Sequence, residues 1–403
     1  MFLSKIRVIQ CAENALITLL IVALYCFSMG FMLSRGSHRI FLYIAAPCTG
    51  LLLLFRSIRG QINPGGMAAS ALMILLYIQS YLAVGHDMAI GFHKHLFWSL
   101  VPLLGISLLP TAYLEPERIR HRHLMAIFCA LFVWVHWMGY VFNLNSAGLL
   151  TNIHFLALFT VLTLPILVYS VSHTRHTGLR GLYLLAAIAD LLLLLKTQSR
   201  PGYLALLAAC LVTLPFFRPR LQGILLTGGI AGFSGFYFTD IFGFRQRVED
   251  LVIHFSQEER NLIWSETLSL QVNSSLLEWW FGHGIGSYFS DFQPYSSFRD
   301  TNQFFSFPHN FVLDVIYSHG LVGFSLIGMA MIWFVNRLRL AVVSAESRDD
   351  FAQGILLISV IAAHFTHAFL TVPFFSRYHL YPLALILGIG FHYLQRVEQH
   401  EHN

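Results

Sequence analysis

Charged residues are scarce in this chain. Only 11% of its 403 residues are Asp, Glu, Lys or Arg, whereas 56% are hydrophobic. Soluble domains carry about 25% charged residues, so this composition excludes a soluble globular protein and indicates a membrane protein with many spans. The sequence also lacks internal repeats and low-complexity stretches. We therefore expect one membrane bundle rather than a string of modules.

Cysteine and metal-binding patterns are equally sparse. The five cysteines lie in or beside hydrophobic segments, with no metal-ligand spacing and none available for a disulfide outside the membrane. No Asp-x-Asp or Glu-x-Asp occurs in the predicted outer segments, and His86, His93 and His95 in one such loop are a weak basis for a metal site. We expect no metal and no cofactor. The net charge of +5 mostly reflects membrane orientation, so we expect no nucleic-acid partner.

Hydrophobic segments long enough to cross a membrane recur along nearly the whole chain. We predict an all-α fold, a polytopic membrane helix bundle of about 12 transmembrane helices, as a single transmembrane domain over residues 1–403. The first span follows Lys5 and Arg7 and lacks a small-residue cleavage site, so we expect an uncleaved anchor. The predicted spans are 15–33, 39–55, 67–84, 96–113, 124–142, 155–171, 181–195, 203–217, 223–239, 309–335, 351–372 and 378–394.

Positive charge orients these spans. With a cytoplasmic N-terminus, fifteen of the 25 lysines and arginines fall in cytoplasmic segments and six in short outer loops. The other four lie in the long segment 240–308, which the positive-inside rule does not govern. Both termini are therefore predicted to be cytoplasmic, and residues 240–308 to face outward between the ninth and tenth spans.

The outward segment 240–308 is expected to form an inserted helical lobe. Hydrophobic residues recur at three- and four-residue steps from Arg245 to about Phe281, which predicts helix. Its tryptophans suit an element that lies in the membrane interface. The glycine-rich sequence from Gly282 to Tyr288 is predicted to be a structural turn, because no strand precedes it and no Gly-Lys-Ser/Thr follows.

His309 stands where this lobe meets the tenth span, between Pro308 and Asn310. On a continuous helix, Gly320 and Gly323 would lie within roughly 40° of His309, on a face that another helix can approach closely. The positive end of the helix dipole would keep the imidazole neutral, as a general base requires. The alternative is a histidine at a membrane boundary above an ordinary glycine packing face.

Basic residues also open the eighth span. Pro201 suits the first position of a helix, and helix N-termini bind anions through their free N–H groups and the dipole. With Lys196 and Arg200, this end would form a basic cup at the outer face. The alternative is that both side chains only anchor helix ends at the lipid headgroups.

Four motifs follow one another over roughly residues 190 to 330. They are Ser199-Arg200, Arg260-x-x-x-Trp264, the turn from Gly282 to Tyr288, and His309-Asn310-x9-Gly320-x2-Gly323. Together they resemble the signature of the bacterial O-antigen ligase and polymerase superfamily. Pro201 departs from the pattern, since small residues such as glycine or alanine are common at its position.

The resemblance implies a C-type glycosyltransferase-like bundle in the bacterial inner membrane, with a periplasmic active site and an undecaprenyl-diphosphate-linked glycan as donor. Displacing a lipid diphosphate needs a base for the acceptor hydroxyl and positive charge for the leaving group. We predict His309 as the base, and Arg200 and Arg260 as diphosphate clamps in place of a metal. Further substrate-binding candidates are Lys196, Asn310, Arg245, Arg247 and Arg377.

The predicted function is that of an O-antigen ligase, which joins O-polysaccharide to lipid A–core oligosaccharide in lipopolysaccharide biosynthesis. The resemblance implies a single, metal-independent displacement with inversion, among membrane lipids. The first alternative is an O-antigen polymerase, whose acceptor is a second lipid-linked glycan, and another is a protein O-oligosaccharyltransferase. A lipid or polysaccharide transporter is a different class, disfavoured because no interrupted hydrophobic segments recur in matching positions of two halves.

Overall fold

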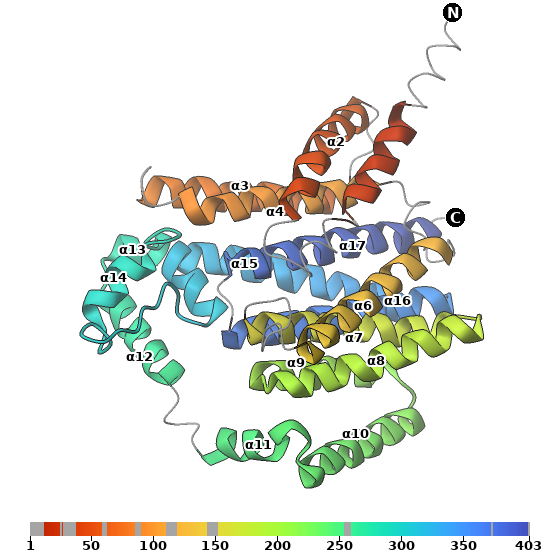
Figure 1. Ribbon diagram of the computed structural model, residues 1–403. Helices are drawn as coiled ribbons and strands as arrows, with labels where there is room; N and C mark the ends of the chain where they lie inside the picture. Colours follow the sequence, from red (N-terminus) through yellow and green to blue (C-terminus); the bar gives the residue numbers. More distant parts are fainter. Residues whose placement is uncertain are drawn as a thin grey trace, which may run out of the picture.

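The computed structural model of the chain describes residues 12–24, 26, 38–58, 63–84, 90–109, 119–142, 152–253, 259–371 and 374–401. Within these ranges the secondary structure is entirely helical, and helices lie at all twelve predicted spans. Five of them, α7, α8, α10, α15 and α16, are long and apolar enough to cross a membrane. The fold is therefore that of a polytopic, all-α membrane protein (Figure 1).

The span helices are the helix Ala12–Leu24, α2 (His38–Ile58), α3 (Pro64–Val84), α4 (Ile90–Ser107), α6 (Ile119–Val141), α7 (Ile153–His173), α8 (Thr177–Thr197), α9 (Arg200–Thr213), α10 (Pro219–Thr239), α15 (Phe311–Val343), α16 (Arg348–Thr371) and α17 (Arg377–Glu401).

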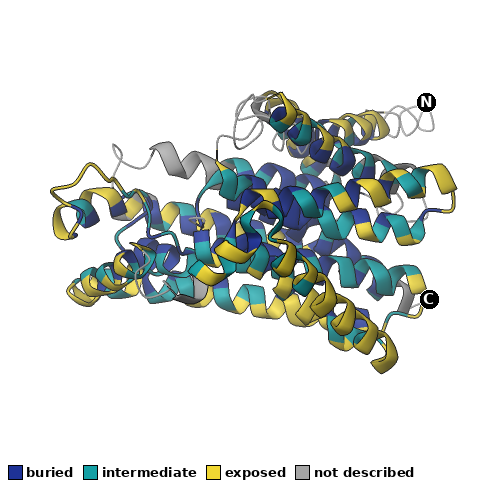
Figure 2. Cartoon of the chain, turned by 60° about the horizontal axis from the view of Figure 1, so that its bottom comes forward, coloured by how far each residue is buried: buried dark blue, intermediate teal, exposed yellow. Residues whose placement is uncertain are grey.

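Two groups of packed helices form the core. In the first, α16 packs against α7 and α9, and α7 packs against α8; in the second, α17 packs against α4 and α15. The helix α16 also packs against α15 and α17, so the two groups share one continuous core. Buried apolar side chains line these contacts, as Figure 2 shows by the dark blue of the central helices. By contrast, the apolar α10 has no buried residue and lies with α11 along one side of the bundle. An apolar surface of this extent is expected where lipid chains take the place of water.

The segment between α10 and α15 contains α11 (Phe244–Ile253), α12 (Glu259–Val272), α13 (Leu276–Phe281) and α14 (Tyr288–Tyr295). The last three lie together at one end of the bundle, opposite the end of α17 (Figure 1). The segment from Arg245 to about Phe281 is predicted to be helical, and in the structure it contains α11, α12 and α13. A capping box starts α13: Ser275 Oγ accepts from the Glu278 N–H, and Glu278 accepts from the Ser275 N–H.

The prediction of a continuous helix that begins at His309 is wrong. The first helical residue of α15 is Phe311, and His309 has a left-handed backbone with φ 54°. Gly320 interrupts the helix with φ 62° and ψ −167°, a conformation that essentially only glycine adopts. His309, Gly320 and Gly323 therefore do not share one helical face.

Gly320 instead receives the backbone of the glycine-rich turn. A Cβ added to Gly320 would stand 2.4 Å from the carbonyl carbon of Trp280, and one added to Gly282 would stand 2.4 Å from the backbone N of His319. Backbone hydrogen bonds complete the contact, from the His283 N–H to the Tyr317 oxygen at 2.8 Å and from Gly284 to Ser318 at 2.9 Å. We call this contact the turn–helix junction. Two of the sequence motifs thus meet in space, backbone to backbone.

Side chains near the end of α3 stabilise the turn–helix junction. Gln79 donates through Nε2 to the carbonyl oxygens of Phe281 and His319, and its Oε1 lies 2.7 Å from Nδ1 of His319. The Ile285 N–H donates to Ser80 Oγ at 2.6 Å. Side chains of α3 therefore form hydrogen bonds with backbone groups at the helix break and in the turn, where regular secondary structure is interrupted.

Candidate active site

His309 lies just before α15, at the end of the bundle that carries α12. Asn310 is the N-cap of α15, and its Oδ1 accepts from the N–H groups of Val312 and Leu313 at 2.9 and 3.2 Å. The helix starts at this cap, while His309 takes a conformation that non-glycine residues rarely adopt. Such strain is concentrated at functional sites.

The His309 ring is oriented and neutral. It donates to the backbone carbonyl of Thr371, so that nitrogen carries the proton and the other keeps its lone pair. The ring of Phe307 lies beside it, with centroids 4.4 Å apart. Burial, and then the charge of Arg260, lower the pKa of His309 to about 4. Burial beside a cation therefore favours the neutral ring, as the proposed base requires.

Arg260 extends from α12 toward the end of α16. Its Nη1 donates to the carbonyl oxygen of Leu370 at 2.8 Å. Burial, and then the positive charges of Arg200 and Arg247, lower the pKa of Arg260. The positive charges of Arg200, Arg247 and Arg260, from α9, α11 and α12, therefore disfavour one another. Asp250, ion-paired with Arg247 at 3.9 Å, offsets part of this repulsion, and a bound anion would offset more.

Local structure fixes the other two arginines. Arg200 begins α9, directly after the N-cap Ser199, and Pro201 fits within the first turn. The departure at Pro201 therefore leaves the start of this helix intact. Arg247 in α11 donates through Nε to the carbonyl oxygen of Gln198 at 3.2 Å. We call Arg200, Arg247, Arg260 and His309 the arginine–histidine cluster.

The predicted site residues Lys196 and Arg245 are not part of the arginine–histidine cluster. Lys196 Nζ lies 5.3 Å from the ring centroid of Phe242. Arg245 is half exposed and ion-paired with Asp240 and Glu249 at 4.0 and 3.9 Å.

The last residues considered from the sequence are Arg377 and the three histidines of one predicted loop. Arg377 donates to Tyr378 Oη at 3.0 Å, and Tyr378 stacks on Phe155 at 3.6 Å, so Arg377 lies at the same end of the bundle as the start of α7. His86 and the side chains of His93 and His95 lie outside the described residues.

His154 is a further residue of this site, and it was not among those predicted from the sequence. It lies in the first turn of α7, where its Nε2 is 3.5 Å from Nη2 of Arg260 and its Nδ1 is 3.4 Å from Ser199 Oγ. The topology predicted from the positive-inside rule puts the starts of α7, α9 and α15 at the same membrane face. A search for polar residues at all three starts would have found His154 beside Arg200 and His309.

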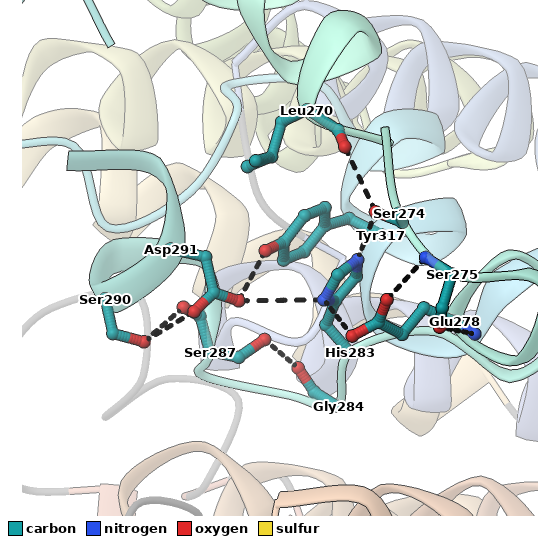
Figure 3. Close-up of polar contacts among 10 residues, drawn as sticks. All are labelled: Leu270, Ser274, Ser275, Glu278, His283, Gly284, Ser287, Ser290, Asp291 and Tyr317. Carbon is teal, nitrogen blue, oxygen red and sulfur yellow. Dashed lines mark hydrogen bonds and ion pairs between the residues drawn. The ribbon is translucent and has the colours of Figure 1, made fainter. Parts of the chain in front are cut away.

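A second polar group attaches α12–α14 to α15 (Figure 3). The His283 ring stacks on Tyr317 at 4.3 Å, and its Nε2 lies 2.9 Å from Ser274 Oγ. Ser, His and Asp side chains in one place suggest a nucleophilic triad, but Nδ1 is 3.7 Å from Asp291 and 3.6 Å from Glu278, beyond hydrogen-bonding distance. Asp291 instead accepts from the Tyr317 hydroxyl at 2.5 Å. This group therefore holds the turn–helix junction together.

Comparison with known proteins identifies the central part of the chain. Residues 185–328 match the family model described as O-antigen ligase. These residues carry the O-antigen ligase domain, and this family suggests a glycan-transferring enzyme. The match extends from α8 to the middle of α15 and includes all four sequence motifs. No curated protein matches the chain.

Proposed function

We propose that this protein is an O-antigen ligase, which transfers O-polysaccharide from undecaprenyl diphosphate to lipid A–core oligosaccharide at the periplasmic face of the bacterial inner membrane. In this proposal the twelve span helices cross the membrane as a C-type glycosyltransferase-like bundle, both termini are cytoplasmic, and α11–α14 belong to the periplasmic lobe 240–308. The arginine–histidine cluster is the active site.

The observation that carries the proposal is three like-charged guanidinium groups beside a neutral histidine. The positive charges of Arg200, Arg247 and Arg260 disfavour one another, and Asp250, ion-paired with Arg247 at 3.9 Å, offsets part of this repulsion. A diphosphate with several negative oxygens would relieve the rest. His309 supplies a lone pair next to this charge. The transfer of a sugar from a diphosphate needs both features at one place.

The chemistry follows from these positions. An acceptor hydroxyl attacks the anomeric carbon of the donor, and the bond from that carbon to the diphosphate oxygen breaks with its electron pair on the leaving group. His309 takes the hydroxyl proton on the nitrogen that does not bind Thr371. The arginines stabilise the charge on the departing diphosphate. One displacement inverts the anomeric carbon.

The choice of a ligase over a polymerase rests on the lobe. Its helix α13 exposes Leu276, Leu277, Trp280 and Phe281, an apolar surface suited to the membrane interface. With the basic residues Arg245, Arg247, Arg260 and Arg299, the lobe is suited to a second phosphate-rich amphiphile, such as lipid A–core, beside the carrier lipid.

Deletion of the gene distinguishes a ligase from a polymerase. Loss of a ligase should leave lipopolysaccharide with bare core, while long polymer accumulates on undecaprenyl diphosphate. The measurement is a gel of lipopolysaccharide from the deletion strain, its parent and a complemented strain. A band of core plus one repeat unit in the deletion strain would assign the polymerase function instead.

Transfer should need no divalent cation, because no Asp-x-Asp occurs in the predicted outer segments and the arginines carry the positive charge. Purified enzyme should therefore keep its activity in excess chelator, with cation-dependent aggregation of the lipid substrates controlled for. In the same assay, Arg200→Lys should lower activity about 10- to 100-fold, since a point charge cannot replace a guanidinium fork on two phosphate oxygens.

Arg220→Lys is the matched control for Arg200→Lys. Arg220 also lies in the first turn of a span helix, α10, but its side chain is exposed and, in the proposed topology, lies at the cytoplasmic end of that helix, so its replacement should change activity little. A requirement for Mg²⁺ or Mn²⁺, or equal losses in the two variants, would contradict the assignment of Arg200 as a diphosphate clamp.

A further inference from the structure

His154 links the lobe arginine to the start of α9. Its Nε2 faces Nη2 of Arg260 at 3.5 Å, and its Nδ1 faces Ser199 Oγ at 3.4 Å. Ser199 Oγ in turn accepts from the Gly202 N–H at 3.4 Å as the cap of α9. One imidazole therefore bridges three helices, α7, α9 and α12.

The chemistry of these partners sets the state of the ring. A guanidinium has only N–H donors, so His154 Nε2 must be the acceptor and carry no proton. The proton of the neutral ring is then on Nδ1, which donates to Ser199 Oγ. Both ring nitrogens are used, whereas His309 keeps one lone pair for a substrate. His154 is thus unsuited to be a second base.

Arg260 gains a fixed orientation from this arrangement. Its Nη1 is held by the Leu370 carbonyl of α16, and its Nη2 by His154 of α7. Two anchors on different helices fix the plane of the guanidinium, and the N–H groups that remain can bind phosphate oxygens.

We propose that His154 is a positioning residue, which orients the Arg260 guanidinium for the diphosphate of the donor. The inference rests on the proposed function, because it assigns a diphosphate to this site. His154 itself does not touch the diphosphate, and its effect on binding passes through Arg260.

Two amide variants test the proposal. Asparagine places its amide near the position of Nδ1, so His154→Asn keeps the contact with Ser199 and loses that with Arg260. Glutamine reaches the position of Nε2, so His154→Gln keeps an acceptor for Arg260. Binding of undecaprenyl diphosphate to the purified full-length protein should fall about 10-fold in His154→Asn, the effect of one hydrogen bond to a charged group. It should stay within about 2-fold of wild type in His154→Gln.

A double-mutant cycle shows whether the effect passes through Arg260. In the Arg260→Ala background the difference between His154→Asn and His154→Gln should disappear. The matched control is His136→Asn, which replaces a buried histidine of α6 whose Nδ1 bonds the Phe132 carbonyl. This control should bind like wild type.

The outcomes separate the two proposals. If the wild-type protein binds no undecaprenyl diphosphate, the proposed function fails. If it binds but the two His154 variants bind equally, the proposed function stands and the role of His154 is wrong. A difference that persists without Arg260 would also overturn the proposal, since His154 would then act on the diphosphate directly.

Discussion

Replacing His309 by alanine is expected to abolish glycan transfer, with a fall of about 10²–10⁴-fold in rate, the usual contribution of a general base. Expression and membrane insertion should be unchanged, because His309 lies before the first helical residue of α15. The measurement is transfer by the purified variant in an assay with donor and acceptor lipids. Near-normal activity would remove His309 from the mechanism.

The backbone at His309 calls for a second variant. At φ 54° alanine is less favourable than histidine, because histidine, asparagine and aspartate are enriched in this conformation; the change to alanine therefore adds some strain to the loss of the base. Asparagine tolerates this conformation better than other non-glycine residues, so His309→Asn keeps the backbone and lacks the base. It should be as inactive as His309→Ala while its melting temperature stays close to that of wild type. Recovery of activity in His309→Asn would assign the loss in His309→Ala to strain.

The same base sets the pH profile of the free enzyme. The lowered pKa of His309, about 4, keeps the ring neutral as the pH falls from 7 to about 5. The value of kcat/KM for the donor should therefore stay level over this range and fall only as the pH approaches about 4. A half-maximal value near pH 6.5, the ordinary pKa of histidine, would show that a different, exposed histidine controls the reaction.

The second large effect is expected from Gly320→Ala. The added Cβ would lie 2.4 Å from the Trp280 carbonyl, on a residue whose φ of 62° and ψ of −167° only glycine adopts readily. The strained backbone alone costs about 1–3 kcal/mol, and the overlap must push the turn away from α15. The hydrogen bonds from His283 and Gly284 would then break. We expect a lower melting temperature in detergent and loss of most activity, since Arg260 lies on the same lobe.

Gly328→Ala is the matched control for Gly320→Ala. It lies on the same helix, with regular helical geometry, and a Cβ there meets no atom within 4 Å. Its stability and activity should equal those of wild type or exceed them slightly, as alanine favours helix over glycine. If the two variants behave alike, the turn–helix junction does not hold the lobe in place.

The sequence by itself determined the helices and the class of protein. Each predicted hydrophobic span coincides with a helix, from 39–55 in α2 to 378–394 in α17, although several helices begin or end at other residues than predicted. This was possible because helix formation in an apolar segment depends on residues a few positions apart. The four motifs likewise lie within the matched residues 185–328, since each motif is a local pattern.

Only the tertiary structure decided what these motifs do together. Gly320 breaks its helix because the backbone at Trp280, forty residues earlier, occupies the space of a side chain. His309 is neutral because of burial and Arg260, neither of which its own neighbours in sequence reveal. His154 lies more than a hundred residues from Arg260, and only the packing of α7, α9 and α16 brings them together. Contacts between distant segments depend on how helices pack, and the pattern along one helix records which face is apolar but not which partner covers it.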